Sequence, residues 1–245
     1  MRRFFIDTPI SQTMRITGID ARHIVSVLRL TIGNTIMVSG QDGQACKAEI
    51  TQASPEIVEL KLLEVIEDKT ESPIAVWLAQ GLAKGEKMDF IVQKAVELGV
   101  HGIIPVITEH CVVRYDSAKQ ADKVTRWQKI AREAAKQCGR SQIPQVYPIV
   151  HLADVLLNND LTNANKIMLY EGEASKGLKQ ELAQSSFQAY VLFIGPEGGF
   201  SSAEVELCQR HGVNIVTMGP RIMRTETASL AALTSVMYEC GDLGG

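Results

Sequence analysis

The stretch "VLFIGPEGGFSSAEVE", residues 191–206, combines a strand, a glycine-rich turn and a helix start. Its first four residues are apolar, which is typical of a strand covered on both faces of a sheet. The segment GPEGG at 195–199 is a turn whose glycines let the backbone approach a ligand closely. Ser201 and Glu204 have the S-x-x-E spacing of a capping box, so a helix is expected directly after the turn. The stretch therefore predicts a ligand-binding loop between a buried strand and a helix.

The chain from residue 73 onward continues this alternation of strands and helices. Strand-like segments include IAVWLAQG at 74–81, GIIPVI at 102–107, AYVLFIG at 189–195 and VNIVTMG at 213–219. Helix-like segments lie at 87–100, 201–212 and 228–241, with a long polar helix over 117–140. Such alternation predicts an α/β domain with a mostly parallel sheet.

Residues 1–70 have a different pattern, with short alternating strands separated by turn residues. GQDG at 40–43 lies between two alternating runs, which predicts a β-hairpin. One helix, DARHIVSVLRL, interrupts the strands, and Asp20 is its expected N-cap. The charged segment EDKTESP at 67–73 has the composition of a linker. We therefore expect a small, barrel-like β domain over 1–70 and an α/β domain over 73–245.

Composition and charge limit the class of protein. The 245 residues are 45% hydrophobic and 22% charged, as in ordinary soluble proteins, and no apolar run approaches the roughly 18 residues that span a bilayer. The five cysteines include no C-x-x-C pair, so neither a disulfide framework nor a metal site is expected. The N-terminus does not have the features of a secretory signal, and we expect a cytoplasmic protein without a membrane partner. The net charge of −3 does not predict a nucleic-acid binder, but it leaves a local basic patch open.

A second polar loop follows the strand-like segment at 213–219. Pro220 turns the chain there, and Thr225 or Thr227 is the expected cap of a helix that begins near ASLAAL. Because the carboxyl ends of parallel strands meet at one edge of a sheet, this loop and the GPEGG loop are expected to form one site. Ordinary turns that bear solvated charges are the alternative. Neither loop has G-K-[ST] or G-x-G-x-x-G spacing, which disfavours a P-loop kinase and a Rossmann dehydrogenase.

Basic residues occur in both expected domains at places that fit contact with a phosphate backbone. In the long polar helix, lysine and arginine recur every three or four residues, so many of them share one face. A solvated charged face is the alternative. Other basic residues lie in the first domain and at the junction QGLAKGEKMD. The predicted RNA-binding residues are Arg2, Arg3, Arg22, Arg29, Lys84, Lys87, Arg132 and Arg140.

Four ordered motifs resemble one family of enzymes. GEKMDFIVQKAVELGV, WQKIAREAAKQCGR, FIGPEGGFSSAEVE and MGPRIMRTETA, with these separations, resemble the RsmE family of 16S ribosomal RNA uridine N3-methyltransferases, which belongs to the SPOUT superfamily. The resemblance covers essentially the whole chain. It implies a PUA-like β-barrel followed by a SPOUT domain with a deep C-terminal trefoil knot. It also implies S-adenosylmethionine as cofactor, a homodimer, and one specific uridine in the 16S rRNA of the small ribosomal subunit as target.

The resemblance further implies which residues bind the cofactor. These positions are Leu169, Ile194, Gly195, Pro196, Glu197, Gly198, Met218, Gly219, Ile222, Thr225 and Ala228. The chain departs from the family's pattern after the strand-like segment KIMLYEG, where Glu171-Gly172-Glu173 stand in place of a more apolar stretch. The role of this loop is therefore left open.

Methylation of uridine N3 requires in-line positioning of the reactants and loss of the N3 proton. An arginine aimed at the uracil oxygens would stabilise the negative charge that results, and Arg224 is the first candidate, Arg221 the second. Glu226 and Glu197 are candidates for the base, although Glu197 fits a structural role in its loop equally well. The target base must be unpaired or extruded from its helix. Alternative functions are methylation of another RNA base or of a ribose 2'-hydroxyl, and a non-catalytic rRNA-binding assembly factor.

Overall fold

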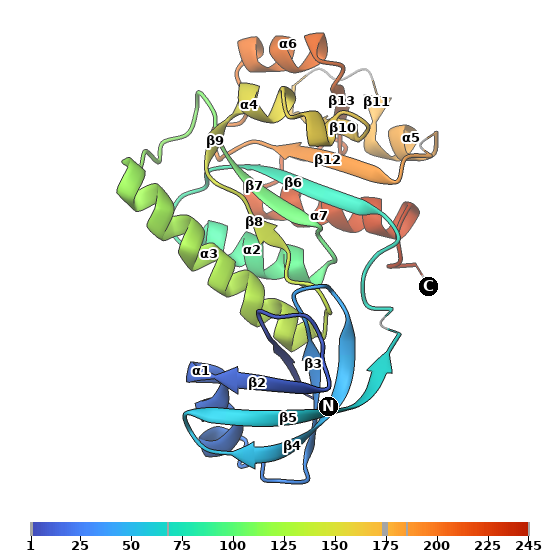
Figure 1. Ribbon diagram of the computed structural model, residues 1–245. Helices are drawn as coiled ribbons and strands as arrows, with labels where there is room; N and C mark the ends of the chain where they lie inside the picture. Colours follow the sequence, from blue (N-terminus) through green and yellow to red (C-terminus); the bar gives the residue numbers. More distant parts are fainter. Residues whose placement is uncertain (1, 68, 173–175, 185, 245) are drawn as a thin grey trace. The chain divides into compact units, whose positions relative to one another are not determined.

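The computed structural model describes residues 2–67, 69–172, 176–184 and 186–244, which form two compact units (Figure 1). The first unit is Met1–Glu71 with Ala135–Ile143, and the second is Ser72–Ala134 with Pro144–Gly245. The short segment Ala135–Ile143 lies within the expected second domain in sequence, but it groups with the first unit. Two ion pairs explain this grouping: they join Lys136 Nζ to Asp20 Oδ1 at 2.7 Å and Arg140 Nη2 to Glu71 Oε2 at 2.5 Å.

The first unit contains a five-stranded sheet in the order β1-β3-β4-β5-β2. Its strands are β1 (Arg3–Phe5), β2 (Thr13–Thr17), β3 (Thr35–Ser39), β4 (Ala45–Ala53) and β5 (Ile57–Ile66). The predicted hairpin is confirmed, because β3 and β4 pair antiparallel on either side of GQDG. Among the described strand pairs of this sheet, β1–β3 is the parallel one. The described strands leave β1 and β2 at the two edges, so their pairing does not close the expected barrel.

The predicted helix of the first unit is shorter than expected and has a different start. It consists of α1 (Gly18–Arg22) and a π-helical turn, η1 (His23–Val27). The prediction that Asp20 caps it is wrong, because Thr17 occupies the N-cap position and Asp20 lies inside the helix, where its carboxylate pairs with Lys136. Ala21 and Ile24 are buried, so this segment covers the apolar core of the sheet.

The second unit contains an eight-stranded sheet whose described pairings are all parallel. Its order is β11-β13-β10-β12-β6-β7-β8, and β9 also pairs with β7. The strands are β6 (Ala75–Gly81), β7 (Gly102–Ile107), β8 (Gln145–Val146), β9 (Val150–His151), β10 (Asn165–Leu169), β11 (Lys176–Gly177), β12 (Ala189–Ile194) and β13 (Asn214–Thr217). The prediction of an α/β domain with a parallel sheet is confirmed.

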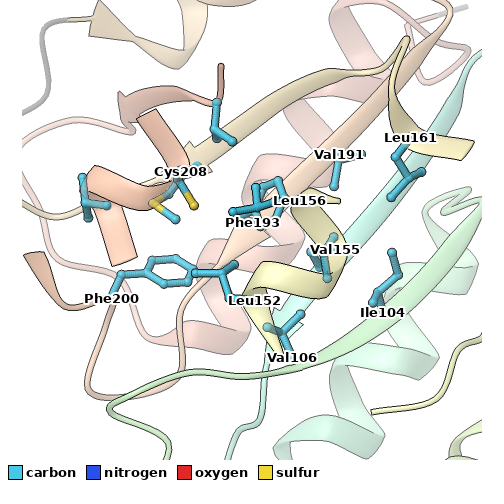
Figure 2. Packing of buried hydrophobic residues seen from close by; sticks show 14 residues of the cluster. Ile104, Val106, Leu152, Val155, Leu156, Leu161, Val191, Phe193, Phe200 and Cys208 are labelled. Atoms are coloured by element: carbon cyan, nitrogen blue, oxygen red, sulfur yellow. The ribbon is translucent and has the colours of Figure 1, made fainter. Parts of the chain in front are cut away.

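Helices cover both faces of this sheet, as its apolar central strands require. They are α2 (Lys87–Glu97), α3 (Ser117–Cys138), α4 (Leu152–Leu156), α5 (Leu178–Leu182), α6 (Ser202–Arg210) and α7 (Thr225–Glu239), with a 3-10 turn, η2 (Asn159–Leu161). Leu152 and Val155 of α4 and Cys208 of α6 pack with Phe193 of β12 (Figure 2). Helix α7 packs against α2, β6 and β12. Figure 1 shows α4 and α6 on one side of the sheet and α2 and α7 on the other.

The long polar helix is α3, which ends at Cys138, two residues before its predicted end. Although most of its residues are polar, it is anchored by the buried Trp127, whose indole Nε1 donates to Asp89 Oδ1 of α2 at 3.1 Å. Arg126 pairs with the same carboxylate. Among the helices of the described chain, none is both long enough and apolar enough to cross a membrane.

Phe193 offers a test of the core of the second unit. The substitution Phe193→Ala removes a fully buried ring from the central strand β12 and leaves a cavity, so we expect a loss of about 3–5 kcal/mol of stability. Phe187→Ala is the matched control, because Phe187 is about half exposed (47%) and its loss should change stability much less. Thermal unfolding of both variants measures the difference. Equal midpoints would contradict the packing described here.

Candidate functional site

The loops that follow β12 and β13 line one cavity at the carboxyl edge of the parallel sheet. Its volume is about 490 Å³, within the range of pockets that bind small molecules. The loop after β10 contributes a third wall through Tyr170 and Glu171. Three neighbouring strands therefore send their loops into the same space, as expected for a ligand site in an open parallel sheet.

Most of the predicted cofactor-binding residues line this cavity. They are Leu169, Ile194, Gly195, Pro196, Glu197, Met218, Gly219, Ile222, Thr225 and Ala228. Gly198 is not among the lining residues. Its carbonyl oxygen instead lies 2.9 Å from His110 Nδ1, and a Cβ atom at this position would come within 2.8 Å of His110 Cβ. Gly198 therefore lets the loop pack closely on His110 rather than on a ligand.

Two glycines have conformations that the loops require. A Cβ atom on Gly195 would lie 3.0 Å from the Cα atom of Gly199, so a larger residue there would push the backbone of the GPEGG turn apart. Gly219 has a φ of 104°, a backbone conformation that other residues rarely adopt, and it has open space around it. The first glycine is needed for close packing and the second for the direction of the chain.

The helix starts at the two loops are built differently. The predicted capping box of α6 is confirmed, because Glu204 N donates to Ser201 Oγ at 3.3 Å and Ser201 N donates to Glu204 Oε2 at 2.9 Å. The prediction that Thr225 or Thr227 caps α7 is wrong. Arg224 occupies the N-cap position, and its side chain makes no capping hydrogen bond.

Thr225 has a tertiary role instead. Its hydroxyl donates to the carbonyl oxygen of Gly195 at 2.6 Å and accepts from Gln80 Nε2 at 3.0 Å. The hydroxyl of Ser229, one turn further along α7, contacts Gln80 Oε1 and the carbonyl oxygen of Thr225. These three side chains are buried. The network therefore fixes the GPEGG loop to the end of β6 and to the first turn of α7.

A cluster of charged side chains borders the cavity. Lys87, the first residue of α2, has its Nζ 3.1 Å from Glu197 Oε1 and 3.2 Å from Glu226 Oε2. Glu197 Oε1 also accepts from the backbone N–H of Lys84 at 3.0 Å. The cluster joins the GPEGG loop, α2 and α7.

The surroundings of these groups keep all three charged. Contact with Glu197 is the main cause that raises the pKa of the Lys87 ammonium. Burial acts to raise the pKa of Glu197, but the Lys84 N–H and the Lys87 ammonium outweigh it and hold this pKa below its usual value. Burial acts on Glu226 in the same direction, yet its own backbone N–H, Lys87 and the charge of Arg224 hold the pKa of this carboxyl low as well.

The predicted catalytic residues differ in whether they line the cavity. Arg221 and Arg224 line the cavity, and both are exposed. Glu226 does not line it, since its carboxylate turns to Lys87, and its buried Oε2 atom accepts no hydrogen bond from any described residue. The arginines are therefore placed to contact a ligand directly, whereas Glu226 is placed behind Lys87.

The predicted RNA-binding residues do not form one set. Arg2, Arg22 and Arg29 are exposed on the first unit, and Arg3 and Arg132 are half-buried. Lys84 is exposed, but Lys87 borders the cavity. Arg140 does not fit the prediction that it contacts RNA. Its side chain is buried and its guanidinium bonds to the carboxylate of Glu71, so it does not face a phosphate backbone.

Sequence reasoning missed several residues of this site. Tyr170, Phe200, Thr217 and Met223 line the cavity, and Glu171 lies at its edge with Oε1 3.1 Å from where a Cβ atom on Gly199 would stand. Part of the loop after β10, residues 173–175, lies outside the described residues. Gln80 and Ser229 were also missed. For Gln80 a signal exists, since it is the polar residue near the end of the apolar strand IAVWLAQG.

Two family models match successive parts of the chain. Residues 70–237 match the family model described as an RNA methyltransferase domain, and residues 16–63 match the RNA methyltransferase PUA domain. The fold, the cavity and these matches define a class of protein: an RNA methyltransferase with an N-terminal PUA domain.

Similar proteins narrow this class. The Bacillus subtilis protein named ribosomal RNA small subunit methyltransferase E is 37% identical, and the similarity covers 100% of this chain and 99% of that protein. The crystal structure of the Neisseria gonorrhoeae protein of the same name, bound to S-adenosyl methionine, has a TM-score of 0.87 at 34% identity and covers 99% of both chains. A Legionella pneumophila protein in complex with the cofactor SAM has a TM-score of 0.86 at 34% identity, covering 99% of this chain and 100% of that one. The chain belongs to the RsmE family of ribosomal RNA small subunit methyltransferases.

The two threonines at the start of α7 allow a matched test of the buried network. Thr225→Val keeps the shape of the side chain but removes the hydroxyl that bonds Gly195 and Gln80, so we expect a loss of about 1–3 kcal/mol. Thr227→Val changes an exposed side chain in the same turn and should be nearly neutral. Thermal unfolding compares the two variants. A larger loss in Thr227→Val would favour the capping role that the sequence suggested.

Proposed function

We propose that this protein transfers a methyl group from S-adenosylmethionine to N3 of one specific uridine in the 16S rRNA of the small ribosomal subunit. The observation that carries the proposal is the cavity between the loops after β12 and β13, lined by glycines, apolar side chains and two arginines in a chain of the RsmE family. The names of the relatives, and the bound S-adenosyl methionine in two similar structures, support the cofactor and the rRNA substrate.

The residues of the cavity fit such a cofactor. Leu169, Ile194, Met218, Ile222 and Ala228 offer apolar surface for an adenine ring, and the tight GPEGG turn brings backbone groups close to the cavity. When bound, S-adenosylmethionine supplies a methyl group on an electrophilic sulfonium. The buried network that fixes the GPEGG loop keeps this wall of the cavity in place before any ligand arrives.

Arg224 and Arg221 have the chemistry that the uridine requires. Loss of the N3 proton leaves negative charge on N3 and on the two flanking carbonyl oxygens. A guanidinium that lines the cavity, as those of Arg221 and Arg224 do, stabilises that charge as it develops. Arg224 is the better placed of the two, since the backbone after it is held by α7 while Arg221 lies in the middle of the loop.

The carboxylates have a different part in the proposal. Backbone N–H groups, those of Lys84 for Glu197 and of Glu226 itself for Glu226, act with Lys87 to hold the pKa of both carboxyls below its usual value. A carboxylate with a lowered pKa is a weak acceptor for the N3 proton. We therefore assign most of the catalytic effect to the arginines and to positioning. Glu226 stays the candidate for the base that removes the N3 proton. Glu197 has a structural role, because it holds its loop through the Lys84 N–H and Lys87.

The rest of the proposal concerns architecture and partners. We infer a PUA-like RNA-binding domain over 1–70, a SPOUT domain over 73–245 with a C-terminal trefoil knot, and a cytoplasmic homodimer that binds the small subunit. Exposed apolar side chains on α2 and α7, Phe90 and Tyr238, support a dimer formed by these helices. The exposed arginines of the first unit, Arg2, Arg22 and Arg29, support contact with rRNA phosphates.

Arg224→Met tests the assigned role of the guanidinium. The variant keeps an apolar side chain of similar length, so we expect the rate of methyl transfer to fall by about 10²–10³-fold. Arg210→Met, at the exposed end of α6, removes the same charge away from the cavity and should keep the normal rate. The measurement is single-turnover transfer of labelled methyl to small subunits. An unchanged rate in Arg224→Met would remove Arg224 from the catalytic residues.

The product itself tests the proposed function. Small subunits from a strain that lacks the gene are incubated with the protein and labelled cofactor, and the rRNA nucleosides are then separated and identified by mass. We expect the label in 3-methyluridine at one position. Label in another base or in a ribose would show a different target, and no label together with tight rRNA binding would show an assembly factor.

A further inference from the structure

Lys87 has contacts that a phosphate-binding lysine would not need. Its ammonium lies 3.1 Å from the Glu197 carboxylate of the GPEGG loop and 3.2 Å from the Glu226 carboxylate in the first turn of α7. Lys87 itself begins α2. One side chain therefore links three elements that meet at the cavity, and only about a third of it is exposed (31%).

The two carboxylates differ in what else holds them. Glu197 Oε1 also accepts from the backbone N–H of Lys84, which is fixed by the chain and independent of the side chain there. Glu226 Oε2 is a buried atom, and the Lys87 ammonium 3.2 Å away is its close counter-charge. A partly buried carboxylate that loses its counter-charge is destabilised, because water compensates for the loss only in part.

We infer that Lys87 is a positioning residue, which holds the GPEGG loop and the start of α7 together through Glu197 and Glu226 and so sets the shape of the cavity, instead of a contact to rRNA. The inference rests on the proposed function in one respect, that S-adenosylmethionine is the ligand of this cavity. It replaces the assignment of Lys87 to the RNA-binding residues.

The charges around the cluster show what removal of the ammonium would do. Glu226 faces Lys87 on α2, Arg224 at the start of its own helix and, across Lys87, Glu197 of the GPEGG loop. His110 is a further titratable group that contacts this loop, through the carbonyl oxygen of Gly198. Without Lys87, two carboxylates would share one site with no cation between them, and like charges that close disfavour ionisation of both.

The substitution Lys87→Met therefore changes how the protein responds to pH. With the cation present, both carboxylates have a pKa below the usual value, so they stay ionised from about pH 5.5 to about pH 8 and the site does not change. In Lys87→Met, the pKa of one carboxyl rises, and the proton that it binds at low pH relieves the repulsion. The variant should recover as the pH falls.

The experiment measures cofactor binding by calorimetry and thermal unfolding of the cofactor-free protein, each at about pH 5.5 and about pH 8. We expect Lys87→Met to bind S-adenosylmethionine about tenfold more weakly than the unchanged protein at the higher pH, with most of the loss reversed at the lower pH. Its unfolding midpoint should follow the same trend. His110 is present in both proteins, so the comparison isolates the effect of Lys87.

Three further variants identify the cause. Lys94→Met removes a lysine from the same helix, where it pairs with Glu97 among the described contacts, and should behave as the unchanged protein. Lys87→Arg retains a cation between the carboxylates and should restore binding. The double variant Lys87→Met with Glu197→Gln removes the repulsion and should lose the pH dependence, while the amide oxygen of the new side chain is still able to accept from the Lys84 N–H.

Separate outcomes decide the two proposals. If the unchanged protein binds no S-adenosylmethionine, the proposed function fails, while the pH trend of the unfolding midpoints still tests Lys87. If Lys87→Met binds normally and shows no pH trend, the positioning role is wrong. It is also wrong if Lys87→Met lowers the salt dependence of rRNA binding as much as Lys84→Met does, since that is the behaviour of a phosphate contact.

Discussion

The buried contact between Thr225, Gly195 and Gln80 is the constraint on which the site depends. It joins the first turn of α7 to the loop after β12 and to the end of β6, at the edge of the sheet where the cavity opens. Hydroxyl and amide groups that are buried must find partners, so these positions have few alternative arrangements. The loops themselves contain little regular structure, and this network gives them a defined shape.

The charged cluster adds a second tie at the same place. Lys87 bridges Glu197 and Glu226, which lie on the two elements that the neutral network already joins. Arg221 and Arg224 line the cavity beside these ties, whereas Glu226 does not line it and contacts Lys87. The loops that carry the arginines thereby have a defined shape before a base arrives, which favours positioning and electrostatic stabilisation in catalysis.

The sequence predicted local structure more reliably than tertiary contacts. The apolar strand β12, the glycine turn and the Ser201–Glu204 box follow from neighbouring residues, and each is confirmed. The prediction that Thr225 caps its helix is wrong because the sequence shows the residues next to it but not Gln80, which is 145 positions away. The same limit explains Lys87 and Arg140, since a basic residue looks alike in sequence whether it meets a phosphate or a carboxylate from a distant segment.

The central claim is that the cavity between the loops after β12 and β13 binds the methyl donor. A crystal structure of the protein with S-adenosylmethionine tests it most directly. The account predicts the cofactor between Gly195 and Met218, with its sulfonium on the side of Arg224. Cofactor found at any other surface, with this cavity filled by side chains or solvent, would contradict the account.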